Sequence, residues 1–309
     1  MRIDCQKAKK LLSQGQVVAV PTETVYGLAA SLGSERGIEK IFELKSRPPA
    51  NPLIVHVSRK EHVEDLALEL PPYFDELTRK FWPGALTLVA PAKPSIPEIA
   101  RAGLPTIAMR MPNHPDAIEI IDHVGPIVAP SANLSGRPSS TTADHVEEDF
   151  GKDFPVLDGG LCRMGIESTI LIFKEGKWHA GRLGSIPLED LEAVLPYPLE
   201  PLGSGKNPSC PGQLYKHYSP KAALTMGIDS CGSFPEVILG FKGRSYGSAK
   251  KVFILGDLER PETIMANLYK VLRQVDIEGI KEAYVDDDFP KKGILATVAE
   301  RLAKASSQA

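Results

Sequence analysis

The chain has 309 residues, with 36 basic and 39 acidic side chains that give a net charge of -3. This length predicts about two domains, and a composition of 42% hydrophobic and 24% charged residues excludes collagen-like, disulfide-scaffold and disordered classes. No stretch is apolar enough to span a membrane and the first residues lack a signal core, so we expect a cytoplasmic protein without membrane contact. The four cysteines are far apart and in no zinc-binding spacing, which is typical of free thiols in a reducing compartment.

The first part of the chain alternates predicted strands and helices. Residues 16–20 are a short apolar run that ends at Pro21, the pattern of a buried strand leading into a loop. Apolar residues at helical spacing predict a helix over 35–45, which the following prolines cannot continue. Strands with intervening helices indicate an α/β domain with a large mixed sheet. The further predicted strands are 52–57, 85–90, 106–111, 126–130 and 168–173.

Prolines divide the chain into two parts. At the usual frequency we would expect about 15 prolines, whereas the chain has 27, of which seven lie between Pro187 and Pro220. Such a segment is predicted to hold neither a helix nor a central strand, so we interpret it as a linker. Beyond it, a β-β-α-β-α pattern predicts a small doubly wound unit, with elements at 237–241, 251–256, 261–275, 282–285 and 292–305. The predicted divisions are a first domain at 1–200, a linker at 201–222 and a second domain at 223–309.

Two polar loops follow predicted strands, where ligand sites of α/β sheets tend to lie. Residues 21–28 carry two hydroxyls, a carboxylate and a phenol; the equally weighted alternative is a turn in which Thr22 or Thr24 caps a following helix. Residues 130–142 carry six hydroxyls, an amide and an arginine, a set that suits phosphate, ribose or adenine edges. The alternative there is a surface loop whose last threonines cap a helix that begins near Ala143.

A cationic segment lies between the predicted helix 35–45 and the next strand. Lys45 and Arg47 precede prolines that stiffen the backbone around Asn51, and the strand then presents His56. A lysine beside an arginine suits a polyphosphate better than a single carboxylate. The alternative, a charge pair that complements the helix dipole for about 0.3–1 kcal/mol, requires no such rigid scaffold. For His56 taken alone, a hydrogen-bonded structural histidine is the favoured interpretation.

Six segments in order resemble the threonylcarbamoyl-AMP synthase family and its YrdC-like catalytic domain. They are PTETVYGLAA (21–30), KSRPPANPLIVHV (45–57), FWPGALTLV (81–89), PSANLSGRPSSTTADHV (130–146), ESTI (167–170) and HAGRLG (179–184). The family's paired K-x-R and S-x-N motifs stand at Lys45/Arg47 and Ser131/Asn133. The linker sequence at 211–220 and the small second domain resemble the long form of the family. The resemblance implies an α/β fold: a YrdC-like twisted mixed-sheet catalytic domain plus a small Rossmann-like α/β C-terminal domain.

The resemblance also implies an activity. L-threonine, bicarbonate and ATP would give L-threonylcarbamoyl-AMP, pyrophosphate and water, the first step toward threonylcarbamoyladenosine at position 37 of tRNA. It further implies Mg²⁺ that enters with ATP and a hand-off of the product to the tRNA threonylcarbamoyl transferase, and it leaves direct tRNA contact open. One alternative is a related carbamoyl-adenylate-forming enzyme, against which the scattered cysteines weigh. The other is an RNA-binding module, whose basic surface would comprise Lys45, Arg47, Arg101, Arg110, Arg137 and Arg182.

Carried over residue by residue, the resemblance assigns Lys45 and Arg47 to catalysis. L-threonine is expected at Thr24, His56, Arg110 and Ser168, with Arg110 paired to the amino-acid carboxylate. No metal ligand is assigned, and Glu23 and Glu167 are left between a structural role and metal coordination. Tyr215, His217 and Tyr218 of the linker are expected to close over the cleft as a lid. ATP is expected at Arg47, Asn51, Thr106, Ser131, Asn133, Thr141, Arg182 and Tyr218.

Overall fold

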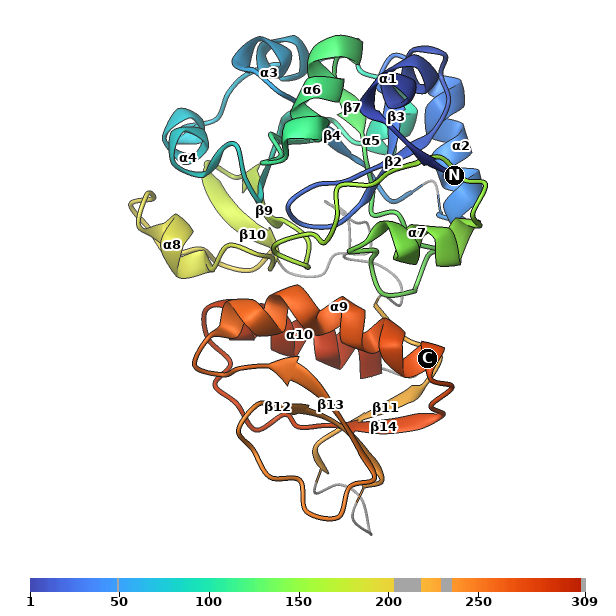
Figure 1. Cartoon of the computed structure of the whole chain (residues 1–309). Coiled ribbons are helices and arrows are strands. Elements are labelled where there is room, and N and C mark those ends of the chain that lie inside the picture. Colours follow the sequence, from blue (N-terminus) through green and yellow to red (C-terminus); the bar gives the residue numbers. More distant parts are fainter. Residues whose placement is uncertain (49, 203–217, 229–234, 307–309) are drawn as a thin grey trace.

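The computed structural model describes residues 1–48, 50–202, 218–228 and 235–306 (Figure 1). Residues 2–182 supply a ten-stranded mixed sheet with the order β1-β8-β2-β3-β7-β4-β6-β5-β9-β10. The predicted mixed sheet is therefore confirmed. Its strands are β1 (Arg2–Ile3), β2 (Val18–Val20), β3 (Gly27–Ser31), β4 (Ile54–His56), β5 (Leu86–Pro91), β6 (Thr106–Arg110), β7 (Ile127–Val128), β8 (Val156–Leu157), β9 (Thr169–Lys174) and β10 (Lys177–Arg182).

Helices cover both faces of this sheet. Leu12 of α1 and Ile120 of α6 pack over one face against Val18, whereas Ile38 and Ile41 of α2 belong to the larger core on the other face. Among the described helices, none is long and apolar enough to cross a membrane. The helices up to residue 192 are α1 (Cys5–Ser13), α2 (Glu35–Lys45), α3 (Lys60–Leu66), α4 (Phe74–Phe81), α5 (Glu98–Arg101), α6 (Pro115–Val124), α7 (Ala143–Phe150) and α8 (Leu188–Glu192).

The loop predicted at 21–28 is the turn of a hairpin. β3 begins at Gly27 and pairs antiparallel with β2, so that Val20 lies opposite Gly27. The suggested helix cap is wrong because a strand follows. Thr22 instead holds the turn itself, since its Oγ1 accepts hydrogen bonds from the N–H groups of Thr24 and Val25 at 3.2 and 3.3 Å. Glycine is required at 27 because a Cβ there would lie 2.9 Å from the Cβ of Ala129.

The proline-rich segment 187–220 begins as part of the first domain. The prediction that it holds no helix is wrong, since α8 starts directly after Pro187, which stands at the N-cap, where a missing N–H costs no helical bond. Leu191, Leu195 and Leu199 are buried in the larger core of the first domain. Tyr215 and His217 of the expected lid lie outside the described residues.

The C-terminal unit is a four-stranded parallel sheet with the order β11-β14-β12-β13. Figure 1 shows both of its long helices on the face toward the first domain, so the Rossmann-like α/β character is confirmed but the doubly wound arrangement is wrong. The strand at 223–226 was missed because its four residues directly follow the prolines. The elements are β11 (Ala223–Met226), β12 (Val237–Phe241), β13 (Lys251–Gly256), α9 (Pro261–Ile277), β14 (Glu282–Val285) and α10 (Ile294–Ser306).

The two units share a packed interface. Val25 and Ile166 of the first domain belong to the same buried cluster as Met265 and Leu268 of α9. Close approach of the backbones is needed at Gly165, where an added Cβ would lie 2.6 Å from the Cα of Ala266. The C-terminal unit is therefore packed against the first domain rather than tethered to it.

Gly165→Ala should weaken this interface. Gly165 has a φ of +73°, and the added methyl group would push α9 away. Gly176→Ala is the matched control, because Gly176 has a φ of +80° but no atom within 4 Å of an added Cβ. Both variants carry left-handed backbone strain of about 1–2 kcal/mol, and overpacking should cost Gly165→Ala at least about 1 kcal/mol more in the free energy of unfolding. Equal losses in urea titrations would contradict the close approach.

Candidate active site

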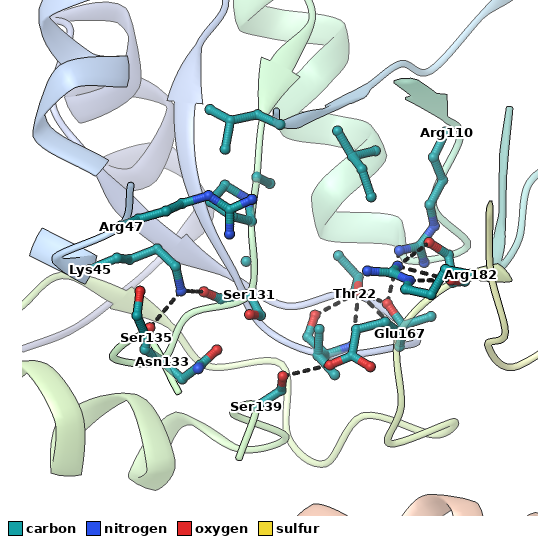
Figure 2. A pocket seen from close by; sticks show the side chains of 18 of the residues that line it. Thr22, Lys45, Arg47, Arg110, Ser131, Asn133, Ser135, Ser139, Glu167 and Arg182 are labelled. Atoms are coloured by element: carbon teal, nitrogen blue, oxygen red, sulfur yellow. Dashed lines mark hydrogen bonds between the residues drawn. The ribbon is translucent and has the colours of Figure 1, made fainter. Parts of the chain in front are cut away.

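A pocket, whose volume of about 800 Å³ includes space open to solvent, is formed by residues of the first domain together with Tyr218 (Figure 2). β4 and β6 run parallel with His56 opposite Arg110, so both strands present their last residue to it. The rest of the wall comes from the hairpin after β2, the end of α2 and the segment after it, the loop after β7, the segment before β9, the end of β10 and Tyr218. The polar residues of the lining are Thr22, Thr24, Lys45, Arg47, His56, Arg110, Ser131, Asn133, Ser135, Arg137, Ser139, Glu167, Ser168, Arg182 and Tyr218.

Two arginines of the pocket are held by neutral oxygens. Arg47 donates to the carbonyls of Asn51 and Pro52 at 3.3 and 3.0 Å. Arg182 donates to the carbonyl of Ser168 at 2.9 Å and to its hydroxyl at 3.2 Å. Burial and then the facing Arg182 lower the pKa of Arg47 to about 10. Within the described residues neither guanidinium forms an ion pair, so both are left with positive charge for a bound anion.

Lys45 joins the end of α2 to the loop after β7. Its buried ammonium donates to the backbone carbonyls of Ser131 and Asn133. Burial, and then the neighbouring Arg47, hold the pKa of Lys45 well below its usual range. The two halves of the K-x-R and S-x-N pair are thus in direct contact, through the backbone of the second motif.

The four residues expected to bind L-threonine lie together. Arg110 donates to the hydroxyl of Thr24 at 2.9 Å and to the carbonyl of Gly84 at 3.1 Å. The Ser168 hydroxyl is 2.7 Å from that of Thr87. His56 is buried, and burial, then Arg110, lower its pKa to about 3, so its imidazole is neutral at pH 7.

Unpaired polar atoms mark the same pocket. Asn133 Oδ1 and His56 Nδ1 are buried and have no hydrogen-bond partner among the described residues. Buried polar atoms in native proteins are nearly always paired with protein, water or ligand. Both atoms are therefore available to substrate atoms in the pocket.

Three predicted ATP ligands lie outside the lining. Thr106 begins β6, about 13 Å from Arg110 at the other end of that strand. Asn51 is buried beside Arg47, and its carbonyl accepts from that arginine. The Thr141 side chain is fully buried and lies 3.3 Å from the ring of His145. The structure brings together the other predicted residues, Tyr218 included.

Glu167, which lines the pocket, and Glu23, which does not, are both paired with arginines. Glu23 lies 2.7 Å from Arg110. Glu167 accepts from Ser139 at 2.6 Å, from Tyr269 at 2.8 Å and from Arg301 at 3.3 Å. Among the described residues, no three His, Cys, Asp or Glu side chains gather as a metal site. The structure thus gives both glutamates an electrostatic role within the protein.

Residues of the C-terminal helices reach the pocket wall, which sequence reasoning missed. Tyr269 stacks on Tyr218 with ring centroids 5.3 Å apart, and Arg301 lies 4.7 Å from the centre of the Tyr218 ring. A signal was present, because Arg273 occupies the apolar stripe of α9 between buried Leu272 and Val275. A charged residue on such a stripe indicates a buried partner on another element.

His145 predicts a loss of stability in acid. Its Nδ1 accepts from the Thr141 N–H at 3.2 Å, and burial, then Arg273, lower its pKa to about 3. Below pH 6.5 the unfolded chain therefore takes up a proton that the folded chain refuses until about pH 3, and stability falls by up to about 1.4 kcal/mol per pH unit. His145→Asn should reduce the slope of the plot of unfolding free energy against pH between 6.5 and 4.5, and the slope that remains includes the contribution of buried His56. His123→Asn is the control, because His123 is exposed and its replacement should leave the slope unchanged. A wild-type slope in His145→Asn would refute the lowered pKa of His145.

Comparison with known proteins places this site in a family. Residues 10–184 match the family model described as Telomere recombination, and residues 186–307 match the one described as Threonylcarbamoyl-AMP synthase, C-terminal domain. Threonylcarbamoyl-AMP synthase of Pyrococcus abyssi is 40% identical over 97% of this chain and 93% of its own length. The chain belongs to the threonylcarbamoyl-AMP synthase family. The Bacillus subtilis synthase is also 40% identical, over 97% of this chain and 92% of its own.

A solved member of the synthase family has the same fold. The crystal structure of P. abyssi Sua5 complexed with L-threonine matches with a TM-score of 0.89 and 36% identity, over 99% of this chain and 96% of that one. The family membership and the two-part α/β fold inferred from the sequence are both confirmed. Every residue of the pocket lining except Tyr218 lies in the part of the chain that the first family model matches.

Proposed function

We propose that this protein is an L-threonylcarbamoyladenylate synthase, which makes L-threonylcarbamoyl-AMP and pyrophosphate from L-threonine, bicarbonate and ATP. One observation carries the proposal. A single pocket joins Arg47 and Arg182, which form no ion pair with any described residue, to a corner around Arg110 and Thr24. The two arginines suit a polyphosphate, and the corner around Arg110 and Thr24 suits an amino acid. The names of the relatives support a product that contains AMP, and the complex of the P. abyssi protein with L-threonine supports L-threonine as a substrate.

Arg110 is suited to hold the carboxylate of L-threonine. Its Nε and Nη1 donate to Gly84 and Thr24, and its Nη2 lies 2.7 Å from Glu23 but has no hydrogen-bond partner in the described part of the chain, so N–H groups remain for a ligand. Those contacts also fix the plane of the guanidinium. The amino group of the bound threonine, once unprotonated, attacks bicarbonate with loss of water, and a carbamate forms.

The second step is adenylyl transfer. A carbamate oxygen attacks the α-phosphorus of ATP, the bond to the β-phosphate oxygen breaks, and pyrophosphate leaves. Arg47 and Arg182 stabilise the charge that develops on the phosphates, and Lys45 keeps the Ser131–Asn133 backbone in place. Because Glu23 and Glu167 are already paired with arginines, we propose that Mg²⁺ enters as the ATP complex, as part of the substrate.

The product is suited to transfer onto adenosine 37 of tRNA, and we propose a hand-off to the tRNA threonylcarbamoyl transferase. The alternative of an RNA-binding module has less support. Arg101 donates to the carbonyls of Ile96 and Leu104, Arg110 pairs with Glu23, and Arg137 pairs with Asp149. Arg101 also lies 3.8 Å from Glu98, so in the described part of the chain half of the six cations proposed for that surface form ion pairs within the protein. Binding of tRNA that weakens steeply with increasing salt concentration would support the RNA-binding alternative.

The test is incubation with ATP, Mg²⁺, radiolabelled bicarbonate and a panel of amino acids. The proposal expects labelled adenylate and pyrophosphate that depend on L-threonine and are lost when EDTA removes Mg²⁺. Product that requires serine instead, or forms without any amino acid, would overturn it.

A further inference from the structure

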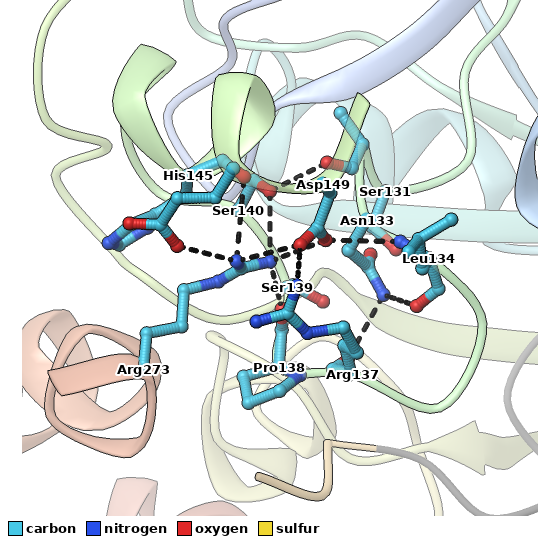
Figure 3. Close-up of polar contacts among 12 residues, drawn as sticks. Ser131, Asn133, Leu134, Arg137, Pro138, Ser139, Ser140, His145, Asp149 and Arg273 are labelled. Carbon is cyan, nitrogen blue, oxygen red and sulfur yellow. Dashed lines mark hydrogen bonds and ion pairs between the residues drawn. The ribbon is translucent and has the colours of Figure 1, made fainter. Parts of the chain in front are cut away.

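A buried arginine of the C-terminal unit reaches the loop after β7 (Figure 3). Arg273 of α9 is 0% exposed and lies among groups of the other domain. It donates to the carbonyl of Pro138 at 2.7 Å, to the hydroxyl of Ser140 at 3.2 Å and to Asp149 of α7 at 2.9 Å. Further contacts reach Glu148 at 3.2 Å and the carbonyl of His145 at 3.4 Å. One side chain therefore bridges the domains by several charge-assisted bonds.

Asp149 links Arg273 to the loop after β7. Its side chain is 0% exposed and accepts from Arg273, from Arg137 and from the N–H of Leu134 at 3.1 Å. The Asp149 carboxylate thus fixes the backbone at Leu134, next to Asn133, and the side chain of Arg137. Without a cation opposite it, a carboxylate at such depth would be strongly destabilised, so its position depends on Arg273 and Arg137 together.

The fixed loop is the one that lines the pocket. Asn133 donates to the carbonyls of Leu134 and Arg137 at 2.8 and 3.0 Å, and its Oδ1 is left buried without a partner among the described residues. Ordering a loop residue costs about 1–2 kcal/mol. A loop held in shape before substrate arrives binds more tightly than one that must be ordered by it.

We propose that Arg273 is a positioning residue for the nucleotide half of the pocket. Through Asp149 it holds residues 133–138 in the shape that presents Ser131 and Asn133 to ATP. The C-terminal unit therefore completes the wall of the active site although none of its helices supplies a substrate ligand in this scheme. The inference rests on the proposed function in assigning ATP to this loop.

Arg273→Met tests the proposal. We expect the dissociation constant of a non-hydrolysable ATP analogue, measured by calorimetry, and the KM for ATP to rise by about tenfold. kcat at saturating ATP and the KM for L-threonine should change less than about twofold, because their groups lie outside this loop. Arg244→Met is the matched control. Arg244 binds buried Asp286 through two bonds of 2.8 Å within the C-terminal unit, so its loss should leave nucleotide affinity unchanged.

Arg273→Lys keeps the test decisive if Arg273→Met does not fold. Lysine preserves a charge opposite Asp149 but cannot bridge Pro138, Ser140 and Asp149 at once. It should fold and bind the analogue several-fold more weakly than the wild type. Nucleotide affinity within about twofold of the wild type in either folded variant would overturn the positioning role. A wild-type chain that makes no threonylcarbamoyl-AMP would refute the proposed function instead, and analogue binding would still decide the role of Arg273.

Discussion

Arg47→Ala should reduce L-threonine-dependent pyrophosphate release by about 10²–10³-fold, the usual cost of removing a preorganised group that stabilises transition-state charge. Arg47 is one of the two pocket arginines without an ion-pair partner among the described residues, and its contacts are to the carbonyls of Asn51 and Pro52. Its removal therefore takes away charge that only a bound anion would use. The measurement is kcat/KM for ATP at saturating L-threonine and bicarbonate.

The control for this variant is Arg36→Ala. Arg36 is exposed in the first turn of α2, the helix that leads into Arg47, and it does not line the pocket. We expect it to retain wild-type turnover. Arg47→Lys should recover only part of the activity, because lysine lacks the planar fork. If Arg47→Ala instead loses its thermal transition, the residue is structural; if it turns over ATP normally, the anion site is elsewhere.

Glu167→Ala should cost about 3–5 kcal/mol of folding free energy, the range for breaking a buried ion pair from one side. It removes the acceptor of Ser139, Tyr269 and Arg301, of which the last is 0% exposed. Burial opposes ionisation of Glu167, but Arg301 and Arg182 hold its pKa below the usual 4.5. Its contribution is therefore complete above about pH 4.5 and is lost as the pH falls through the folded pKa. Urea titration at pH 7 measures the loss.

An exposed ion pair provides the control for Glu167. Glu278 accepts from Lys251 at 2.6 Å, but both side chains are partly exposed. Glu278→Ala should cost less than about 1 kcal/mol. Glu167→Gln keeps the size of the side chain and one acceptor oxygen. Its loss of folding free energy should therefore lie between those of Glu167→Ala and Glu278→Ala. Similar midpoints for Glu167→Ala and Glu278→Ala would show that the interdomain contact adds no stability.

The strands and the ligand loops could be predicted because their signals are local. The helix predicted at 35–45 is α2 (Glu35–Lys45), the apolar runs at 52–57 and 106–111 contain β4 and β6, and the run at 168–173 contains all of β9 except its last residue. β3 was missed because Gly27 and Leu28 extend a polar loop in the sequence and become a strand only by pairing with β2. α8 was missed because proline before a helix looks like proline that breaks one.

The sequence by itself determined the family and the chemistry of the pocket, since Lys45, Arg47, Ser131 and Asn133 stand in short motifs whose residue types do not depend on distant neighbours. Only the tertiary structure decided which charged side chains form ion pairs within the protein. Arg273 meets Asp149 across 124 residues of sequence, and Arg301 meets Glu167 across 134. Such pairs depend on how two domains pack, which no local pattern encodes. That packing leaves Arg47 and Arg182 for the substrate and turns Glu167 from a candidate metal ligand into part of the joint between the domains.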